Sequence, residues 1–245
     1  MRWPLVAGRW PLAPDFYPAN PMTTLINAGI GGNSTADLLA RLERDCLSHR
    51  PDLVILLAGT NDCCNSGKLR EPAVTAAAYA ELADRILAVS RLVLATPLAV
   101  HPPYLKTRHP DAAYGNLPAV ERLARARRAM LDLAVARGVP CVDLASITAG
   151  AGLVGTDPRS WLMNEANAGK TDGVHPTSDG YRGIAAAIGA VVLALQPRPQ
   201  RIVCFGDSIT LGRFVTGEGG VEGENWPSWL KRMLASAVAS DPSPA

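Results

Sequence analysis

The chain has 245 residues, of which 48% are hydrophobic and 19% are charged, as in an ordinary globular protein that buries a core. Its net charge of +2 gives no electrostatic footprint for nucleic acid or an anionic membrane. No apolar run reaches the roughly 18 residues of a membrane span. The opening segment also lacks the roughly 7–15-residue apolar stretch of a secretory signal. We therefore expect a cytoplasmic protein without nucleic-acid partners.

The five cysteines are odd in number and show no C-x-x-C spacing, which favours reduced thiols: Cys46, Cys63, Cys64, Cys141 and Cys204. Two of them, Cys63 and Cys64, directly follow an Asn-Asp turn. A vicinal disulfide or a reactive thiol is one interpretation of this pair. We favour small buried side chains that fill the core.

Short β-rich runs alternate with longer helical patterns, which indicates a parallel sheet covered by helices on both faces. The predicted strands are mostly continuous apolar runs, typical of strands buried on both sides: residues 24–28, 53–58, 92–96, 139–144 and 201–205. The predicted helices span residues 35–49, 72–90, 118–137, 178–195 and 226–239. No repeat or linker divides the chain, so we expect one domain over 23–245 and an N-terminal arm over 1–22.

Two further segments, 101–115 and 148–171, match no regular element, and each follows a predicted strand. Ligands bind open α/β sheets at the carboxyl ends of the strands, so we expect these segments to wall a substrate cleft. They contain Tyr104 and Trp161. Either ring suits stacking against a sugar, and packing at the edge of the core is the alternative.

The last predicted strand runs into the sequence Gly206-Asp207-Ser208. A serine hydroxyl is a poor nucleophile unless a base accepts its proton. Among four histidines, His175 precedes a predicted helix and has Asp172 three residues before it. A tight turn would place Asp172 on one ring nitrogen and leave the other for Ser208. The alternative is that Asp172 is only a turn residue. We expect Asp207 to hold its turn through hydrogen bonds.

Two other turns offer hydrogen-bond donors for the negative charge that develops during acyl transfer. In residues 27–33 a strand runs into a glycine turn and a helix start, where the N–H of Gly32 can face an anion. Residues 59–62 form a Gly-Thr-Asn-Asp turn in which Asn61 offers a side-chain amide. A dinucleotide fingerprint fails because Ser34 replaces its last glycine. Ordinary turn chemistry is the alternative for both segments.

Together, Gly206-Asp207-Ser208, residues 27–32, residues 59–62 and Asp172-x-x-His175 resemble the four conserved blocks of the SGNH (GDSL) hydrolase family. The resemblance covers nearly all of the chain from residue 23 to residue 239. It implies a flavodoxin-like three-layer α/β/α sandwich with a parallel five-stranded sheet. It also implies a serine esterase that uses no metal or other cofactor.

The resemblance also implies a role for each residue of the four blocks. Ser208 is the nucleophile, His175 is the general base, and Asp172 orients the base. The backbone N–H groups of Ser208 and Gly32 and the side-chain amide of Asn61 form the oxyanion hole. Candidates for the substrate cleft outside these roles are Asp207, Tyr104 and Trp161.

The order of the blocks departs from the family, in which the serine block comes first and not last. We interpret this order as a circular permutation, with the cut between the 226–239 helix and the 24–28 strand. The old termini would join through residues 196–200, a length that suits helix-to-strand connections. The 201–205 strand should then lie inside its own sheet. Exchange of this strand in a swapped dimer is the alternative, and the oligomeric state is left open.

Family members act on acetylated carbohydrates, aryl and short-chain esters, lysophospholipids and thioesters. No lid helix or long apolar patch is evident here, which favours a short acyl group such as acetyl on a saccharide. An aryl-ester or lysophospholipid acylhydrolase of the same mechanism is the first alternative. Two alternatives belong to other functional classes. One is a non-catalytic carbohydrate-binding protein, and the other is a phosphoesterase that holds a metal with Asp62, Asp207 and His175.

Overall fold

Five parallel strands form the centre of the computed structural model, which describes residues 23–239. Across the sheet they follow the order β1 (Thr24–Gly29), β5 (Arg201–Gly206), β2 (Leu53–Leu57), β3 (Arg91–Ala95) and β4 (Cys141–Val142). The prediction that the 201–205 strand lies inside the sheet is confirmed, because β5 pairs with β1 on one side and β2 on the other. The predicted N-terminal arm, residues 1–22, lies outside the described residues.

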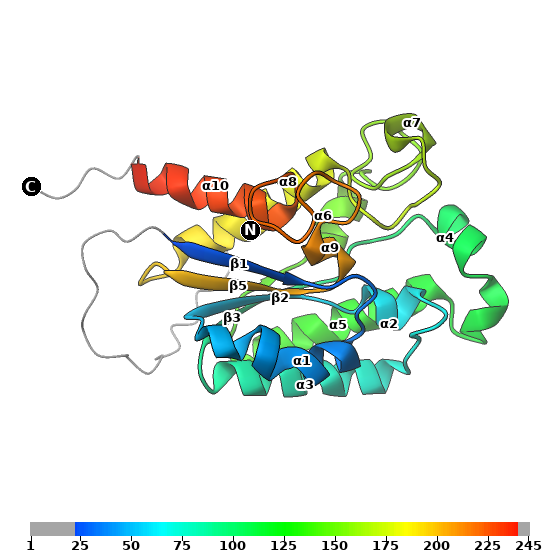
Figure 1. Cartoon of the computed structure of the whole chain (residues 1–245). Helices are drawn as coiled ribbons and strands as arrows, with labels where there is room; N and C mark the ends of the chain where they lie inside the picture. The colour runs from blue at the N-terminus through cyan, green and yellow to red at the C-terminus, as the bar shows by residue number, and fades with distance from the viewer. Residues whose placement is uncertain (1–22, 240–245) are drawn as a thin grey trace, which may run out of the picture.

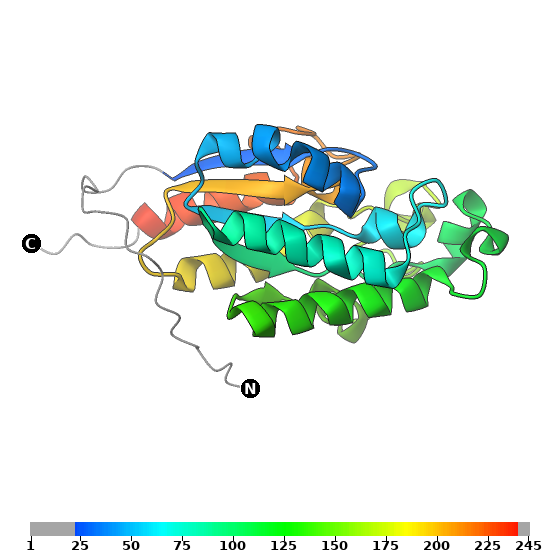
Figure 2. The same ribbon diagram turned by 90° about the horizontal axis from the view of Figure 1, so that it is seen from below.

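Helices cover both faces of the sheet, as Figures 1 and 2 show, and the predicted α/β/α sandwich is confirmed. One face carries α1 (Thr35–Asp45), α3 (Pro72–Leu87) and α5 (Ala119–Arg137). The other face carries α8 (Ser178–Ala194) and α10 (Trp226–Ala239). The alternation of side chains along a strand explains why β5 feeds both cores. Its Val203 and Phe205 side chains pack with the first set of helices, and those of Ile202 and Cys204 with the second.

The predicted helix over residues 35–49 divides into α1 and a short 3-10 helix, η1 (Leu47–His49). The start of α1 has a clear physical cause. The Asp37 carboxylate accepts hydrogen bonds from the backbone N–H of Ser34 at 2.8 Å and from its hydroxyl at 2.7 Å. This contact satisfies a donor that the first turn of a helix leaves free. Ser34 is the N-cap of α1.

The structure corrects several predicted boundaries. The predicted 139–144 strand is only two residues long, because the Asp143 side chain accepts from the N–H of Ser146 and starts α6 (Leu144–Gly150). The expectation that 101–115 and 148–171 hold no element is wrong. They contain α4 (Pro102–Arg108), η2 (Asp111–Tyr114), the end of α6 and α7 (Glu165–Ala168).

The carboxyl ends of the strands meet at one edge of the sheet, where α9 (Ser208–Leu211) and α2 (Thr60–Cys64) begin. The described chain starts and ends near the opposite edge: β1 begins there, and α10 ends there (Figure 1). The site described below is therefore built at the edge away from both ends of the described chain. No helix within residues 23–239 is long and apolar enough to cross a membrane.

Candidate active site

Ser208 is the first residue of α9, directly after the interior strand β5. Its neighbour Asp207 caps this helix, since its carboxylate accepts from the N–H of Ile209 at 2.9 Å. The expectation that Asp207 holds the turn is confirmed. The end of β1 packs tightly against the same helix: a Cβ atom on Gly29 would lie 2.1 Å from the nitrogen of Leu211. Gly29 thereby lets the end of β1 approach the backbone of α9 closely.

His175 lies between Ser208 and Asp172, in the order that the sequence predicts. Its Nε2 is 3.0 Å from the Ser208 Oγ, and its Nδ1 is 2.9 Å from the Asp172 Oδ2. The two residues share one tight turn, in which the Asp172 Oδ1 accepts from the N–H groups of Val174 and His175 at 2.9 and 2.6 Å. This geometry suits a base that accepts the serine proton while a carboxylate orients it.

The Asp172 carboxylate is buried, with 6% of its surface exposed. Burial on its own raises the pKa of a carboxyl group. Hydrogen bonds from His175, the charge of that residue and the charge of Arg108 outweigh burial and lower the pKa of Asp172 to about 2. Arg108, on α4, donates to the Asp172 Oδ2 at 3.3 Å and to its backbone carbonyl at 3.0 Å. Asp172 is therefore held as an anion facing the imidazole.

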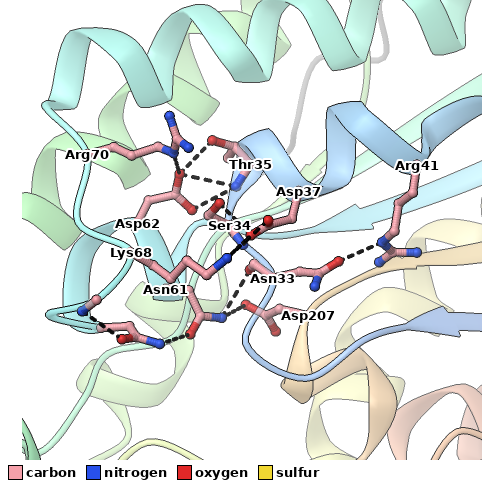
Figure 3. A network of polar contacts seen from close by, with 12 residues as sticks. Asn33, Ser34, Thr35, Asp37, Arg41, Asn61, Asp62, Lys68, Arg70 and Asp207 are labelled. Atoms are coloured by element: carbon pink, nitrogen blue, oxygen red, sulfur yellow. Dashed lines mark hydrogen bonds and ion pairs between the residues drawn. The ribbon is translucent and has the colours of Figure 1, made fainter.

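Gly32 and Asn61 lie at the ends of β1 and β2, on either side of the strand that leads to Ser208. Gly32 has a φ of +77°, which glycine adopts without strain. Its N–H makes no hydrogen bond to any residue within 23–239. The Asn61 amide nitrogen donates to the backbone carbonyl of Asn33 at 3.1 Å and to the Asp207 Oδ2 at 3.4 Å (Figure 3).

Asp207 is completely buried, and its carboxyl group differs from that of Asp172 in its partners. Burial raises the pKa of Asp207 to about 6, and the nearby charge of Asp62 acts in the same direction. The hydrogen bond from Ile209 and the charge of His175 lower it only in part. Among residues 23–239 no cation contacts Asp207 directly, while its carboxylate caps the turn that leads into α9.

Arg41 and Asp62 hold the glycine turn in place from the side of α1 (Figure 3). The buried Arg41 guanidinium donates to the Asn33 side chain at 2.6 Å and to the Gly206 carbonyl at 2.8 Å. Asp62 accepts from the N–H of Thr35 at 3.0 Å and from its hydroxyl at 2.5 Å. Within the described chain, no group of three or more His, Cys, Asp or Glu residues could hold a metal ion.

The other candidates for the substrate cleft lie farther from the reacting atoms. Tyr104 donates from its hydroxyl to the Glu165 carboxylate at 3.3 Å and so links α4 to α7. The Trp161 ring packs against Gly183 on α8 and joins the edge of the core. For Trp161 this contact is the packing alternative considered above, and a role for either ring in the cleft stays a prediction.

The prediction for the cysteine pair is confirmed. Cys63 and Cys64 are free thiols, each with 3% of its surface exposed, and both belong to the core beneath α2. Burial raises the pKa of Cys64 to about 12, so its thiolate is not populated near neutral pH. These two residues fill space beside the site.

Two residues beside His175 escaped the sequence-based predictions. Phe214 lies in a loop after α9, and its ring meets the His175 ring edge-on, with centroids 5.1 Å apart and planes at 83°. The Lys170 Nζ lies 3.9 Å from the centre of the Phe214 ring. Neither residue belongs to a motif or a periodic pattern. Their contacts arise only when the loops that carry Lys170, His175 and Phe214 come together in the fold.

The model of the GDSL-like lipase/acylhydrolase family matches residues 5–182, which is most of the chain. The chain belongs to the GDSL-like lipase/acylhydrolase family. Membership identifies it as a carboxylic ester hydrolase. The matched stretch ends before β5, so Ser208 lies outside it. No curated protein matches the chain.

Solved structures of other proteins share the fold with this GDSL-like chain at low identity. A lipase/acylhydrolase from Enterococcus faecalis is 19% identical with a TM-score of 0.50, over 64% of this chain and 69% of that one. The acetyl xylan esterase AlAXEase is 22% identical with a TM-score of 0.52, over 67% and 79%. A catalytic mutant of an acetylxylan esterase from Geobacillus stearothermophilus is 21% identical with a TM-score of 0.51, over 65% and 68%.

Proposed function

We propose that the protein is a serine esterase that removes a short acyl group through an acyl-enzyme, with acetyl esters of a carbohydrate as its substrates. The observation that carries this proposal is the alignment of three side chains. The Ser208 Oγ lies 3.0 Å from the His175 Nε2, and the His175 Nδ1 lies 2.9 Å from Asp172. A serine gains nucleophilicity when such a base accepts its proton.

In the first half of the reaction, the Ser208 Oγ attacks the carbonyl carbon of the ester while His175 takes the hydroxyl proton. The tetrahedral intermediate collapses when His175 returns this proton to the departing alcohol oxygen. Asp172 stays ionised throughout and stabilises the imidazolium that forms. In the second half, His175 takes a proton from water as the water attacks the acyl-enzyme. His175 then returns this proton to the departing Ser208 Oγ, which releases the acid and restores the serine hydroxyl.

The oxyanion requires donors that are already in place when charge develops on the carbonyl oxygen. We assign this role to the N–H groups of Ser208 and Gly32 and to the amide of Asn61. The 3.4 Å contact from Asn61 to Asp207 is longer than a normal hydrogen bond. An oxyanion would replace this contact and leave the bond to the Asn33 carbonyl intact. Removal of one such donor typically costs about 3–4 kcal/mol of transition-state stabilisation.

Two observations support a small acyl group on a saccharide. Solved structures with this fold include acetylxylan esterases, although their low identity to this chain carries no substrate by itself. The loops at the carboxyl edge carry short helices, α4 and α7, and no long apolar lid among residues 23–239. Aryl esters, lysophospholipids and non-catalytic binding of a carbohydrate remain the competing functions. A screen of acetylated oligosaccharides against aryl and lipid esters distinguishes among the ester substrates.

The direct test uses 4-nitrophenyl acetate and the Ser208→Ala variant. We expect the purified wild-type protein to hydrolyse this ester and the variant to lose the activity. Thermal unfolding of the variant should resemble that of the wild type, because Ser208 is only partly buried at the surface of the site. Equal hydrolysis by both proteins would reject Ser208 as the nucleophile. Absence of hydrolysis in both, with retained carbohydrate binding, would favour the non-catalytic function.

We further propose that residues 23–245 form one catalytic domain whose block order reflects circular permutation. The position of β5 between β1 and β2 supports this interpretation, as do the two described chain ends near one edge of the sheet. A chain reopened before residue 201, with a short linker from residue 239 to residue 23, should fold and retain esterase activity. An unfolded product with several linker lengths would argue against the proposal.

A further inference from the structure

Phe214 has a conformation that an aromatic residue rarely adopts. Its φ is +71°, in the left-handed region, and 42% of its surface is exposed. A residue held in such a conformation carries backbone strain. The exposed part of the ring gains no burial energy in return. Strained residues cluster at functional sites, which directs attention to what surrounds this ring.

Several polar contacts fix the backbone around Phe214. Its N–H donates to the Glu218 Oε1 at 2.8 Å, and the other carboxylate oxygen of Glu218 accepts from Arg213 at 3.3 Å. From α8, the buried Tyr181 donates its hydroxyl to the Arg213 carbonyl at 3.3 Å. The ring is therefore positioned before any ligand arrives.

The Phe214 ring lies beside the proposed catalytic residues. The two nitrogens of His175 face Asp172 and Ser208, and the Phe214 ring packs edge-on against the same imidazole. A group that binds over Phe214 consequently lies next to the Ser208–His175 pair. Because the acyl carbon must reach the Ser208 Oγ, the alcohol part of an ester can extend over this ring.

Lys170 supplies a charge at the same place. Its Nζ lies 3.9 Å from the centre of the Phe214 ring, within the range of a cation–π interaction. Its backbone N–H donates to the carbonyl of the buried Asn164 at 3.3 Å, which anchors the end of the α7 segment. The Lys170 ammonium therefore lies over the same Phe214 ring that packs against His175.

The charge on Lys170 is not neutralised by a carboxylate of the described chain. The other three lysines each pair with an acidic residue: Lys68 with Asp37, Lys106 with Asp111, and Lys231 with Glu222. Arg108 and Arg213, which lie near His175 and Phe214, are also paired, Arg108 with Asp172 and Arg213 with Glu218. An aromatic ring orders a cation without cancelling its charge, so Lys170 remains able to pair with an anion from solution.

We propose that Phe214 and Lys170 form a recognition subsite for a carboxylate on the alcohol part of the ester. The ring contacts the apolar surface of that part, and the ammonium pairs with its carboxylate. On the proposed function, on which this inference rests, the substrate class is an acylated acidic molecule such as an O-acetylated acidic saccharide. This assignment makes Lys170 a specificity residue with no part in bond cleavage.

The test compares 4-acetoxybenzoate with its methyl ester, in which methylation removes the charge of the carboxylate. The quantity measured is the ratio of their kcat/KM values, anionic over neutral. Lys170→Gln should lower this ratio about threefold, the size expected for one exposed ion pair. Lys170→Arg should retain the ratio, and the matched control Lys231→Gln should leave it unchanged. Added salt should lower the wild-type ratio towards that of Lys170→Gln.

An equal ratio in wild type and Lys170→Gln, insensitive to salt, would overturn the subsite. Phe214→Leu supplies a second readout: loss of the cation–π contact should lower the ratio by less than Lys170→Gln does. Failure of the esterase proposal looks different, since neither ester would then be hydrolysed in a Ser208-dependent way. In that case the affinity for 4-hydroxybenzoate, measured by NMR titration, decides. Weaker binding by Lys170→Gln supports the subsite, and equal binding rejects it.

Discussion

Two buried aspartates flank Ser208, and their surroundings act on their carboxyl groups in opposite directions. Asp172 is 6% exposed and contacts His175 and Arg108, which lower its pKa to about 2. Asp207 is fully buried and accepts a hydrogen bond from Ile209, yet burial and the charge of Asp62 raise its pKa to about 6. Burial acts against the ionised form in both cases. The two pKa values differ because Asp172 contacts Arg108 and His175, whereas Asp207 accepts hydrogen bonds from uncharged groups.

This difference indicates how two aspartates in one site can have different roles. The carboxylate that faces the imidazole has an arginine and a histidine in contact, and these contacts favour its ionised form. The carboxylate beside the nucleophile caps a helix and touches the Asn61 amide. Partners, more than depth of burial, distinguish the proposed orienting residue from the structural one.

The largest expected effect comes from Asp172→Asn. The amide keeps the size of the side chain but removes the charge that fixes the His175 tautomer. We expect kcat/KM for 4-nitrophenyl acetate to fall by roughly 10⁴-fold, as for loss of the orienting carboxylate in a serine triad. The matched control is Asp143→Asn, which removes the charge of an aspartate that caps α6 and pairs with Arg127, and it should change the rate little. Similar rates for the two variants would contradict the role of Asp172.

A smaller effect is expected from Asn61→Ala, which removes the amide that contacts Asp207. Loss of one oxyanion donor should reduce kcat by roughly 100- to 1000-fold with little change in KM. Asn116→Ala, an exposed amide remote from the four blocks, serves as the control and should retain full activity. If Asn61→Ala changed KM alone, the amide would bind the substrate and not the oxyanion.

The sequence predicts much of this site because its residues stand at the ends of buried strands. Continuous apolar runs mark strands that are buried on both faces, so β2 and β5 are found within a residue or two. The carboxyl ends of such strands converge. The convergence brings the turns after β1 and β2 to Ser208. The Asp172-x-x-His175 turn precedes α8 and meets Ser208 at the same edge, with 3.0 Å between the His175 Nε2 and the Ser208 Oγ.

Other features were not predictable because they depend on packing between distant loops. Helices of four to seven residues, such as α9 and α4, are too short to show a 3.6-residue pattern. The contact between Arg108 and Asp172 joins two segments that the sequence separates by 64 positions. Phe214 meets His175 from a different loop, and its positive φ has no sequence signature, since glycine would be expected there.

A further expected effect is on stability, and it separates the two aspartates by sign. For Asp207, the folded-state pKa of about 6 exceeds the ordinary 3.8. Its contribution to stability is fully present below pH 3.8 and is lost as the pH rises through 6, a change of about 3 kcal/mol. Asp207→Asn cannot ionise, so its free energy of unfolding relative to wild type should improve from pH 4 to pH 8.

Asp172→Asn should behave in the opposite way in the same urea titrations. The folded-state pKa of Asp172 lies near 2, below the ordinary 3.8, so its contribution is present at pH 8 and is lost as the pH falls through 2. Its removal should therefore destabilise the protein at pH 8 by about 2 kcal/mol. Parallel pH profiles for the two variants would show that the partners do not distinguish these carboxyl groups.

The central claim is that His175 and Asp172 activate Ser208 as a nucleophile. The most direct measurement is the mass of the intact protein after treatment with diethyl 4-nitrophenyl phosphate, followed by mapping of the modified peptide. We predict one diethylphosphoryl group per chain, attached to Ser208, and much slower labelling of His175→Ala. An unlabelled protein, or a label on another residue with Ser208 free, would contradict the claim.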